Sequence, residues 1–382
     1  MNQPPQERIW AKPQEGLRKP RVLVAPLDWG LGHATRCIPI IRELLDNSCE
    51  VLLAGEGAQA NLLRQEFPNL QLLPLKGYRI HYAVSGLAVL LTIIGQVPKI
   101  FRASKYEHEW LGKRVDEYGL DGVISDNRFG LYDKRVPCIF ITHQLCIKTS
   151  LGRWVEDIIQ KKNYTRINRF KECWVPDVKG SDNLAGDLSH PKKMPKVPVR
   201  YIGVLSRFNK LDIDESNNHL LVLLSGPEPQ RSLLEDQIIQ EIAHYNGTAT
   251  IVRGLPESQS VIPSTNMLRF YNHLPADQLN EEMLKAEFVI SRSGYTTVMD
   301  VVKTRKKSIL IPTPGQPEQE YLGEYLKSKR TAYCVSQKEF SLEKALEAAE
   351  SFPYRFDIDT PEAPLKETVA RFVSALDKQK VR

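Results

Sequence analysis

The chain has 382 residues, of which 42% are hydrophobic and 26% are charged, a composition typical of a globular protein in solution. This length exceeds the usual size of one hydrophobic core, so we expect two domains. The net charge of +6 is small, and no basic block indicates a nucleic-acid-binding protein. The six cysteines form no CxxC pair, which argues against a zinc site or a disulfide framework and favours a cytoplasmic location.

Residues 1–20 are rich in proline, glutamine and charge, and they predict a disordered leader with no signal peptide. From Arg21 onward, apolar runs at residues 21–27, 50–55, 70–75, 122–126, 137–143 and 172–177 alternate with amphipathic stretches. Continuous apolar strands separated by helices predict a parallel sheet that is covered on both faces. The sequence therefore predicts a Rossmann-like domain over residues 21–200.

The first strand-to-helix turn of this domain reads DWGLGHATR. Gly30 and Gly32 would let the backbone turn tightly and let a ligand approach, and His33 would stand in the first helical turn. This pattern favours a ligand-facing loop. The alternative is that the glycines serve only the turn, because GxGH lacks the third glycine of a dinucleotide fingerprint.

The most apolar run is LAVLLTII, from Leu87 to Ile94, and its eight residues are too few to cross a bilayer, which needs about 20. It predicts either a buried helix or an apolar surface for peripheral membrane contact. Residues 175–198 then lose all periodicity and read as a linker, while VRYIG after them is either a last strand or part of the crossing.

After a linker at residues 201–218, the alternation restarts with strands at residues 220–226, 248–254, 267–272, 288–293, 307–313 and 331–336. A second Rossmann-like domain is therefore expected over residues 219–382, with its last helix crossing back to the first domain. Because ligands bind beyond the carboxyl ends of the strands in such sheets, the two loop-bearing edges should face each other across a cleft.

The strongest motif lies in the second half, where SRSGYTTVMDVV begins at Ser291 and IPTPGQPEQEYLGEYL begins at Ile311. Thr296 and Thr297 at a helix start would offer hydroxyl and N–H groups to phosphate. Asp300 could accept hydrogen bonds from a ribose diol, and Glu318 and Gln319 could bind sugar hydroxyls. Diphosphate, ribose and hexose are the parts of a sugar nucleotide.

These motifs resemble the donor-binding half of GT-B glycosyltransferases, in particular the family 28 enzymes around the peptidoglycan N-acetylglucosaminyltransferase. The resemblance covers nearly the whole chain from Arg21, and it implies an α/β GT-B fold with an acceptor-binding first domain and a nucleotide-sugar-binding second domain. By position in the family motifs, the implied acceptor-binding residues are Gly30, Gly32, His143 and Gln144. The implied donor-binding residues are Ser225, Gly226, His273, Leu274, Arg292, Ser293, Gly294, Thr296, Thr297, Asp300, Glu318 and Gln319.

One departure from the family concerns SGPEPQR, which has a single glycine and places Glu228 where it would repel a diphosphate unless turned away. Three residues also have simpler interpretations. Arg292 could pair with a carboxylate, Asp300 could be an ordinary acid near a helix N-terminus, and His143 could be a core histidine.

The resemblance implies transfer of a sugar, expected to be UDP-linked, to an acceptor hydroxyl with inversion and without a metal or cofactor. His33 is the candidate base, and Asp126 either orients it or is the base itself. The expected partners are a nucleotide sugar and a glycan or lipid-linked acceptor of the cell envelope, without nucleic acid. The alternatives are a GT-B-like sugar nucleotide epimerase or hydrolase, and a non-catalytic sugar nucleotide binding protein.

Overall fold

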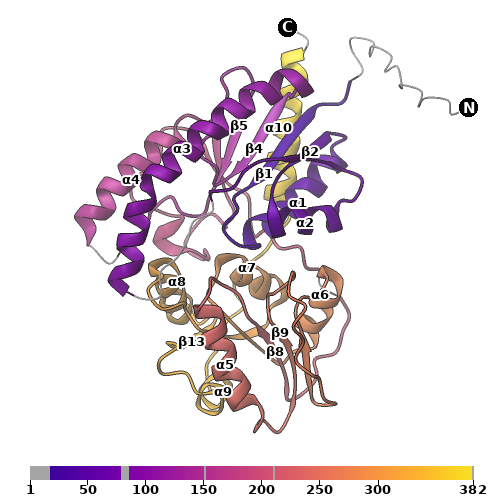
Figure 1. Cartoon of the computed structure of the whole chain (residues 1–382), viewed down its shortest axis with the longest axis vertical. Coiled ribbons are helices and arrows are strands. Elements are labelled where there is room, and N and C mark those ends of the chain that lie inside the picture. Colours follow the sequence, from indigo (N-terminus) through magenta and orange to yellow (C-terminus); the bar gives the residue numbers. More distant parts are fainter. Residues whose placement is uncertain (1–17, 79–85, 150–151, 210, 381–382) are drawn as a thin grey trace, which may run out of the picture.

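A computed structural model of the chain describes residues 18–78, 86–149, 152–209 and 211–380, without the side chains of residues 86–97 and 378–380. Figure 1 shows two lobes, one built mainly from the first half of the chain and one from the second. The predicted disordered leader lies outside the described residues except for residues 18–20.

The first lobe contains a parallel sheet, seven-stranded within the described residues, in the order β3-β2-β1-β4-β5-β6-β7. Its strands are β1 Arg21–Pro26, β2 Glu50–Gly55, β3 Gln71–Pro74, β4 Gly122–Asp126, β5 Cys138–Ile141, β6 Glu172–Val175 and β7 Val199–Tyr201. The helices between them are α1 Gly32–Asp46, α2 Gly57–Glu66, α3 Gly86–Tyr118 and α4 Arg153–Ile167. VRYIG thus contributes β7, the edge strand beside β6.

The second lobe repeats the same winding with the order β10-β9-β8-β11-β12-β13. Its strands are β8 His219–Leu223, β9 Thr248–Val252, β10 Leu268–Tyr271, β11 Phe288–Ser291, β12 Lys307–Leu310 and β13 Tyr333–Cys334. Its helices are α5 Gln230–Ile242, α6 Ala276–Lys285, α7 Tyr295–Thr304, α8 Pro317–Ser328 and α9 Leu342–Glu350, followed by α10 Ala363–Lys380. An order of this kind is that of doubly wound Rossmann sheets, which confirms the predicted fold class.

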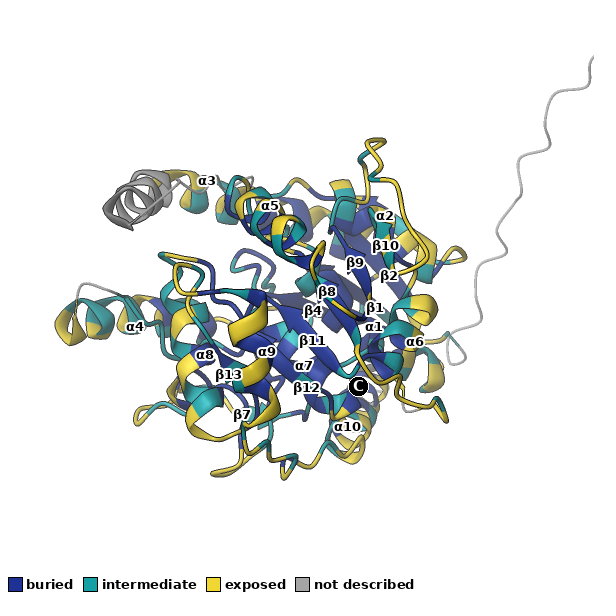
Figure 2. Cartoon of the chain, turned by 90° about the horizontal axis from the view of Figure 1, so that it is seen from below, coloured by how far each residue is buried: buried dark blue, intermediate teal, exposed yellow. Residues whose placement is uncertain are grey.

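Apolar clusters on the two faces of each sheet make the core, and Figure 2 shows the strands buried and the outer helices exposed. One face of the first sheet packs on α1 and α10, and its other face packs on α3 and α4. Helix α10 therefore returns to the first lobe and lies along α1, although it follows the whole second sheet in sequence (Figure 1).

The apolar cluster around α1 continues into the second lobe. Ile38 and Ile41 of α1 belong to the same buried cluster as Tyr295 and Met299 of α7. Because both lobes share this cluster, the junction between them is partly hydrophobic, and this differs from the small polar interface that is usual between domains of one chain.

Residues 175–198 do not form the linker that their lack of periodicity predicts. After β6 they fold back on the first lobe around Asp177, whose carboxylate accepts hydrogen bonds from the Leu184 and Ala185 N–H groups and from Ser189 Oγ. The segment includes a short 3₁₀ helix at Gly186–Leu188 and leads into β7. A single buried carboxylate therefore orders a stretch that has no regular hydrophobic pattern.

The apolar run from Leu87 to Ile94 lies in α3, so its helical backbone agrees with the sequence. Its side chains are outside the described residues, and the choice between a core helix and a membrane-facing surface stays open. None of the helices in the described part of the chain combines the length and apolarity needed to cross a membrane.

Candidate active site at the domain junction

The loop between β1 and α1 lies where the two lobes meet. Gly30 has φ +75°, a left-handed conformation that suits glycine. The side-chain amide of Gln59 on α2 donates hydrogen bonds to the Leu27 and Gly30 carbonyls, which holds this turn from behind. Gly32 is needed for a different reason, because a Cβ there would lie 2.8 Å from Oγ1 of Thr296 on α7. The two glycines therefore shape the turn and bring the N-termini of α1 and α7 together.

A buried polar network follows directly behind this loop. The Arg36 guanidinium binds Asp126 through both carboxylate oxygens, with Nε 2.7 Å from Oδ2 and a second contact from Nη2 to Oδ1. Nδ1 of His33 lies 3.1 Å from Asp126 Oδ1 and 2.8 Å from Arg36 Nη2. Asp126 ends β4, the strand next to β1, so the parallel pairing of these strands places its carboxylate beside the β1–α1 turn.

The same network crosses to the second lobe through His143, which follows β5. Its Nδ1 lies 3.2 Å from Arg36 Nη1, and its Nε2 lies 2.6 Å from Glu318 Oε1 at the start of α8. The His143 ring also stacks on Tyr295 of α7, with ring centroids 4.1 Å apart. His143 is thus buried, but it is paired across the junction and is not a core histidine of one lobe.

Burial and close charges shift the pKa values in this network. Burial and then the Arg36 charge lower the pKa of His33, and the Asp126 carboxylate opposes them only in part. For Asp126, burial favours the neutral acid, but Arg36 and His33 hold its pKa well below the usual range. Burial likewise opposes ionisation of Glu318, while His143 and Arg36 lower its pKa overall. At neutral pH we therefore expect a neutral His33 between ionised Asp126 and charged Arg36.

These contacts correct one of the two predicted roles of Asp126. Its side chain is fully buried and both carboxylate oxygens bind Arg36, so it cannot reach an acceptor hydroxyl. A carboxylate with such a low pKa is also a poor proton acceptor. The position beside His33 Nδ1 is compatible with the other predicted role, that of orienting the imidazole.

The remaining residue in the predicted acceptor set is Gln144. Its backbone N–H donates to Thr142 Oγ1, and its carbonyl accepts from the Asn163 side chain of α4. Gln144 is partly exposed beside His143 at the carboxyl edge of the first sheet. No contact in the structure assigns its side chain a role.

Several predicted donor residues gather at the carboxyl edge of the second sheet. Ser225 and Gly226 form an exposed loop after β8, and Gly226 has φ +109°. Gly294 precedes α7, and an added Cβ there would have no atom within 4 Å, so space is open at this helix N-terminus. Thr296 and Thr297 are partly exposed in the first turn of α7, where free backbone N–H groups favour an anion.

Other predicted donor residues brace these loops. Ser293 Oγ donates to the Gln319 carbonyl, and the Gln319 side chain accepts from the Thr313 N–H and donates to Gln316 Oε1. Glu228, which was expected to repel a diphosphate unless turned away, accepts hydrogen bonds from Arg231 Nε at 2.6 Å and from the Ser232 N–H. Its charge is therefore paired at the start of α5.

The structure contradicts the donor-binding role that the resemblance implies for Arg292. Arg292 is 1% exposed, and its guanidinium donates to the carbonyls of Ile311, Pro312 and Gln230 and to Gln337 Oε1. No described carboxylate is among these partners, so the alternative of a carboxylate pair is also wrong. Burial lowers the pKa of Arg292 to about 10. Its role is to hold together the loops after β11 and β12 and the start of α5.

The predicted contact of Asp300 with a ribose stays a prediction, and the structure gives this residue a contact within the chain. Asp300 is 8% exposed and its Oδ1 accepts a hydrogen bond of 2.6 Å from Ser206, in the crossing between the lobes. Burial raises the pKa of Asp300 to about 6, against the opposing effects of Ser206 and Arg207. The carboxyl group therefore joins α7 to the crossing segment through Oδ1.

A cavity of about 320 Å³ opens between the lobes beside His273, which follows β10. The first lobe contributes Leu31 and residues of α2, and the second contributes Pro256, Glu257 and His273. Leu274, the neighbouring residue in the predicted set, is buried and could contribute only its backbone.

Sequence reasoning missed two arginines at this junction, Arg36 and Arg207. Arg36 organises the buried network. The Arg207 side chain is 7% exposed and forms an ion pair with Glu66, with Nη1 3.6 Å from Oε1, although its Nε and Nη1 have no hydrogen-bond partner among the described residues. Arg36 lies three residues after His33 on one helix face, a spacing that could have indicated it. Nothing in the sequence around Arg207 distinguished it from other linker cations.

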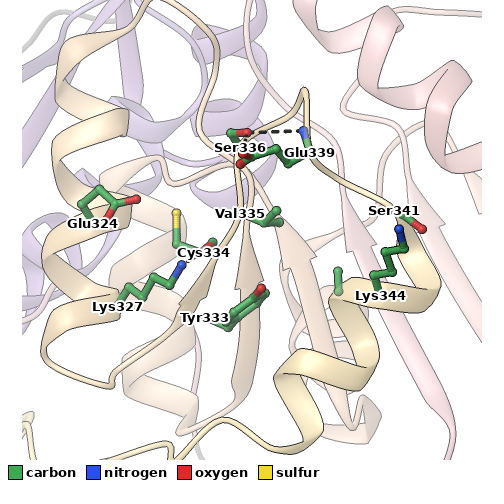
Figure 3. A pocket seen from close by; sticks show the side chains of 10 residues that line it. Glu324, Lys327, Tyr333, Cys334, Val335, Ser336, Glu339, Ser341 and Lys344 are labelled. Atoms are coloured by element: carbon green, nitrogen blue, oxygen red, sulfur yellow. Dashed lines mark hydrogen bonds between the residues drawn. The ribbon is translucent and has the colours of Figure 1, made fainter.

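A second cavity, also of about 320 Å³, lies away from the junction between α8, β13 and α9 (Figure 3). Its lining side chains partly satisfy one another, because Lys327 Nζ donates to the Cys334 carbonyl and Ser336 Oγ donates to Glu339. None of the predicted site residues lines it. Within the described residues, no group of three His, Cys, Asp or Glu side chains has a geometry that could hold a metal ion.

Comparisons with known proteins agree with this two-lobed arrangement. Residues 257–372 match the Glycosyltransferase family 28 C-terminal domain. The chain is 22% identical over 343 residues to the UDP-N-acetylglucosamine--N-acetylmuramyl-(pentapeptide) pyrophosphoryl-undecaprenol N-acetylglucosamine transferase of Gloeothece citriformis (strain PCC 7424), covering 84% of each chain.

Among solved structures, the kitacinnamycin glycotransferase superposes with a TM-score of 0.60 at 14% identity, covering 95% of both chains. The glycosyltransferase SnogD from Streptomyces nogalater superposes with a TM-score of 0.59 at 12% identity, covering 95% of this chain and 98% of that one. These likenesses concern the fold. Together with the sequence matches, they confirm the resemblance to family 28 that the SRSG and EQ motifs predicted.

Proposed function

We propose that this glycosyltransferase, which has the GT-B fold and resembles family 28, transfers a sugar from a UDP-linked donor to a hydroxyl of a lipid-linked acceptor. Transfer would be a single displacement with inversion at the anomeric carbon, and it would need no metal. The match of residues 257–372 to the family 28 C-terminal domain supports the donor class, because it includes the loop and helix of the SRSG motif and the EQ pair.

The observation that carries the mechanism is the position of His33. It begins α1 at the junction, its side chain is 13% exposed, and Asp126 lies on the Nδ1 side of the ring. A neutral imidazole can accept a proton from an acceptor hydroxyl at Nε2, and the Asp126 carboxylate would then stabilise the imidazolium. Removal of that proton is what an inverting transfer requires of the enzyme.

The donor would lie along the carboxyl edge of the second sheet. The N-terminus of α7, with the Thr296 and Thr297 hydroxyls, and the exposed loop at Ser225 and Gly226 would bind the diphosphate. Glu318, whose side chain is 35% exposed, would accept hydrogen bonds from the sugar hydroxyls. Arg207, which is paired with Glu66, is close enough to lower the pKa of Asp300, and its guanidinium would lie near a donor in the cavity beside His273.

The relative from Gloeothece citriformis carries a pyrophosphoryl-undecaprenol acceptor in its printed name, and this supports a lipid-linked acceptor of the cell envelope. Such an acceptor would place this enzyme at the cytoplasmic face of a membrane, as a peripheral protein.

The test is incubation of the purified chain with radiolabelled UDP-N-acetylglucosamine and, separately, UDP-glucose, with a lipid extract that contains polyprenyl-phosphate-linked glycans. We expect label to move into the organic phase at an unchanged rate when EDTA is present, and the product to have the anomeric configuration opposite to that of the donor. Release of free sugar or an epimer without acceptor would instead favour a hydrolase or epimerase. Binding of UDP without any turnover would favour a non-catalytic protein.

A further inference from the structure

Nδ1 of His33 has two neighbours with opposite requirements. Asp126 Oδ1, at 3.1 Å, can only accept a hydrogen bond from Nδ1. Arg36 Nη2, at 2.8 Å, can only donate a hydrogen bond to Nδ1. A neutral imidazole has one protonated and one unprotonated nitrogen. Nδ1 can therefore satisfy one of these neighbours at a time, and the choice decides whether Nε2 carries the proton.

The geometry of Arg36 decides between the two. Its Nε and Nη2 both bind Asp126, which fixes the plane of the guanidinium. Nη2 has a second proton, and His33 Nδ1 lies within hydrogen-bond distance of this nitrogen. Arg36 is 2% exposed, and although burial opposes its charge, Asp126 raises its pKa overall, so it stays a donor at every pH of interest.

His143 has a comparable arrangement around its own two ring nitrogens. Arg36 Nη1 faces its Nδ1 at 3.2 Å, and Glu318 Oε1 faces its Nε2 at 2.6 Å. If Nδ1 accepts from Arg36, Nε2 carries a proton and donates it to the carboxylate, so both ring nitrogens of His143 are satisfied. One guanidinium thus sets the proton positions of two histidines.

We propose that Arg36 is a positioning residue that holds His33 in the Nε2–H tautomer when no substrate is bound, so that His33 cannot act as a base in the resting enzyme. To become competent, Arg36 Nη2 must release Nδ1. A water molecule then gives Nδ1 a proton, which Nδ1 donates to Asp126 as a hydrogen bond, and Nε2 gives its own proton to water, so the imidazole stays neutral. Nε2 then accepts the proton of the acceptor hydroxyl. This inference rests on His33 being the base of the proposed function.

The groups that face His33 come from several elements. Arg36 and Cys37 lie on α1, Asp126 ends β4, His143 follows β5, and Glu318 opens α8. Cys37 Sγ contacts Asp126 Oδ2 at 3.7 Å, and burial raises the pKa of its thiol, so it stays neutral and does not compete as a charge. The link through His143 makes Glu318, the proposed sugar-binding residue, the nearest group by which a donor would reach Arg36.

The test is ¹⁵N NMR of histidine-labelled, ligand-free protein at pH 8.5, where His33 is neutral because burial and Arg36 lower its pKa, with His33 assigned from the spectrum of His33→Gln. We expect the Nε2–H signature for His33 in the wild type and the Nδ1–H signature in Arg36→Met, because Asp126 is then the only partner of Nδ1. Arg42→Met is the matched control: Arg42 lies on the same helix, is exposed and binds Glu66, so the His33 signal should not change.

An Nδ1–H signature for His33 in the wild type would overturn the proposal, and so would an unchanged signature in Arg36→Met. Loss of Arg36 leaves a buried charge on Asp126, so the variant could fail to fold. In that case the wild-type spectrum alone decides. The readout needs no turnover, so a failure to find sugar transfer would count against the proposed function and leave the tautomer result standing.

Discussion

Replacing His33 should slow sugar transfer without weakening the binding of UDP. In His33→Ala we expect sugar transfer to fall by about 10²–10⁴-fold, the usual contribution of a general base. Affinity for UDP, measured by calorimetry, should stay close to that of the wild type, because the proposed donor contacts lie on the second lobe. His244→Ala, at an exposed position just after α5, is the control and should transfer sugar normally.

Transfer at the wild-type rate by a folded His33→Ala protein would remove the proposed base. Asp126 could not take over this role, because its carboxylate is buried against Arg36. A different group at the junction would then have to accept the proton.

Asp300 provides a prediction about stability and pH. Its pKa rises from 3.8 to about 6 in the folded chain, so the folded state binds more protons than the unfolded state between these values. Stability should therefore fall as the pH rises through this window, and the full cost should be present above about pH 6, on the order of 3 kcal/mol. Asp300→Asn, which keeps an acceptor for Ser206, should be more stable than the wild type at pH 7.5 and no more stable near pH 4.

Urea unfolding of both proteins at the two pH values measures this difference. Glu347→Gln, at an exposed position on α9, serves as the control and should show no such dependence. Equal stability of Asp300→Asn and the wild type at pH 7.5 would show that the carboxyl group is not strained by burial.

At the residue scale, the sequence located the right motifs but not the direction in which each side chain points. His33, Asp126 and His143 were found because each follows a strand at the carboxyl edge of a parallel sheet, where side chains of neighbouring strands must meet. Arg292 and Asp300 lie in an equally well placed motif, yet they turn inward to carbonyl groups and to Ser206. That direction depends on contacts with segments distant in sequence, which a motif does not contain.

At the element scale, the approach of α1 to α7 depends on Gly32. A methyl group at this position would lie 2.8 Å from Thr296 Oγ1, and the buried helices leave little room to move. Gly32→Ala should therefore lower the free energy of unfolding by about 1–3 kcal/mol, the usual cost of overpacking. The double variant Gly32→Ala/Thr296→Ala should recover part of this loss, because it removes the Oγ1 atom.

Chemical unfolding of the two single variants and the double variant gives the coupling free energy between the positions. Additive losses would mean that the helices are not in contact in solution. Gly30→Ala is informative beside them, because its Cβ would meet no atom within 4 Å and its cost would come from φ +75° alone.

The order of strands and helices was predictable, because apolar runs of strand length alternate with helical periodicity throughout both lobes. The folded structure of residues 175–198 was not predictable from the sequence. It docks on the second lobe through Tyr321 Oη, which accepts from the Asp187 N–H, and Tyr325 Oη, which donates to Asn183. Such ordering comes from single polar contacts, and these leave no periodic signal in the sequence.

For the whole molecule, the shared apolar cluster predicts that the two lobes unfold together. Ile38 and Ile41 of the first lobe and Met299 of the second lose their buried surroundings if either lobe opens. Differential scanning calorimetry should give one transition with equal calorimetric and van't Hoff enthalpies. Two resolved transitions would show that the junction contributes little to stability.

The same cluster also affects how far the two lobes can move relative to each other. A small polar interface would favour closure of the cleft when a donor binds, but a hydrophobic junction resists large relative movement of the lobes. We expect small-angle scattering curves with and without saturating UDP to be nearly the same. A clear decrease in the radius of gyration on binding would show that the cavity beside His273 closes.

Helix α10 has a consequence for how the chain is made. Val369, Phe372 and Leu376 of this helix cover α1 and the adjacent sheet face, and an added Cβ at Gly122 would meet Phe372. During synthesis the ribosome releases the first sheet long before this helix, because the entire second lobe is translated between them. Until α10 is synthesised, the nascent first lobe therefore exposes an apolar face. Chaperones would be needed most at this stage.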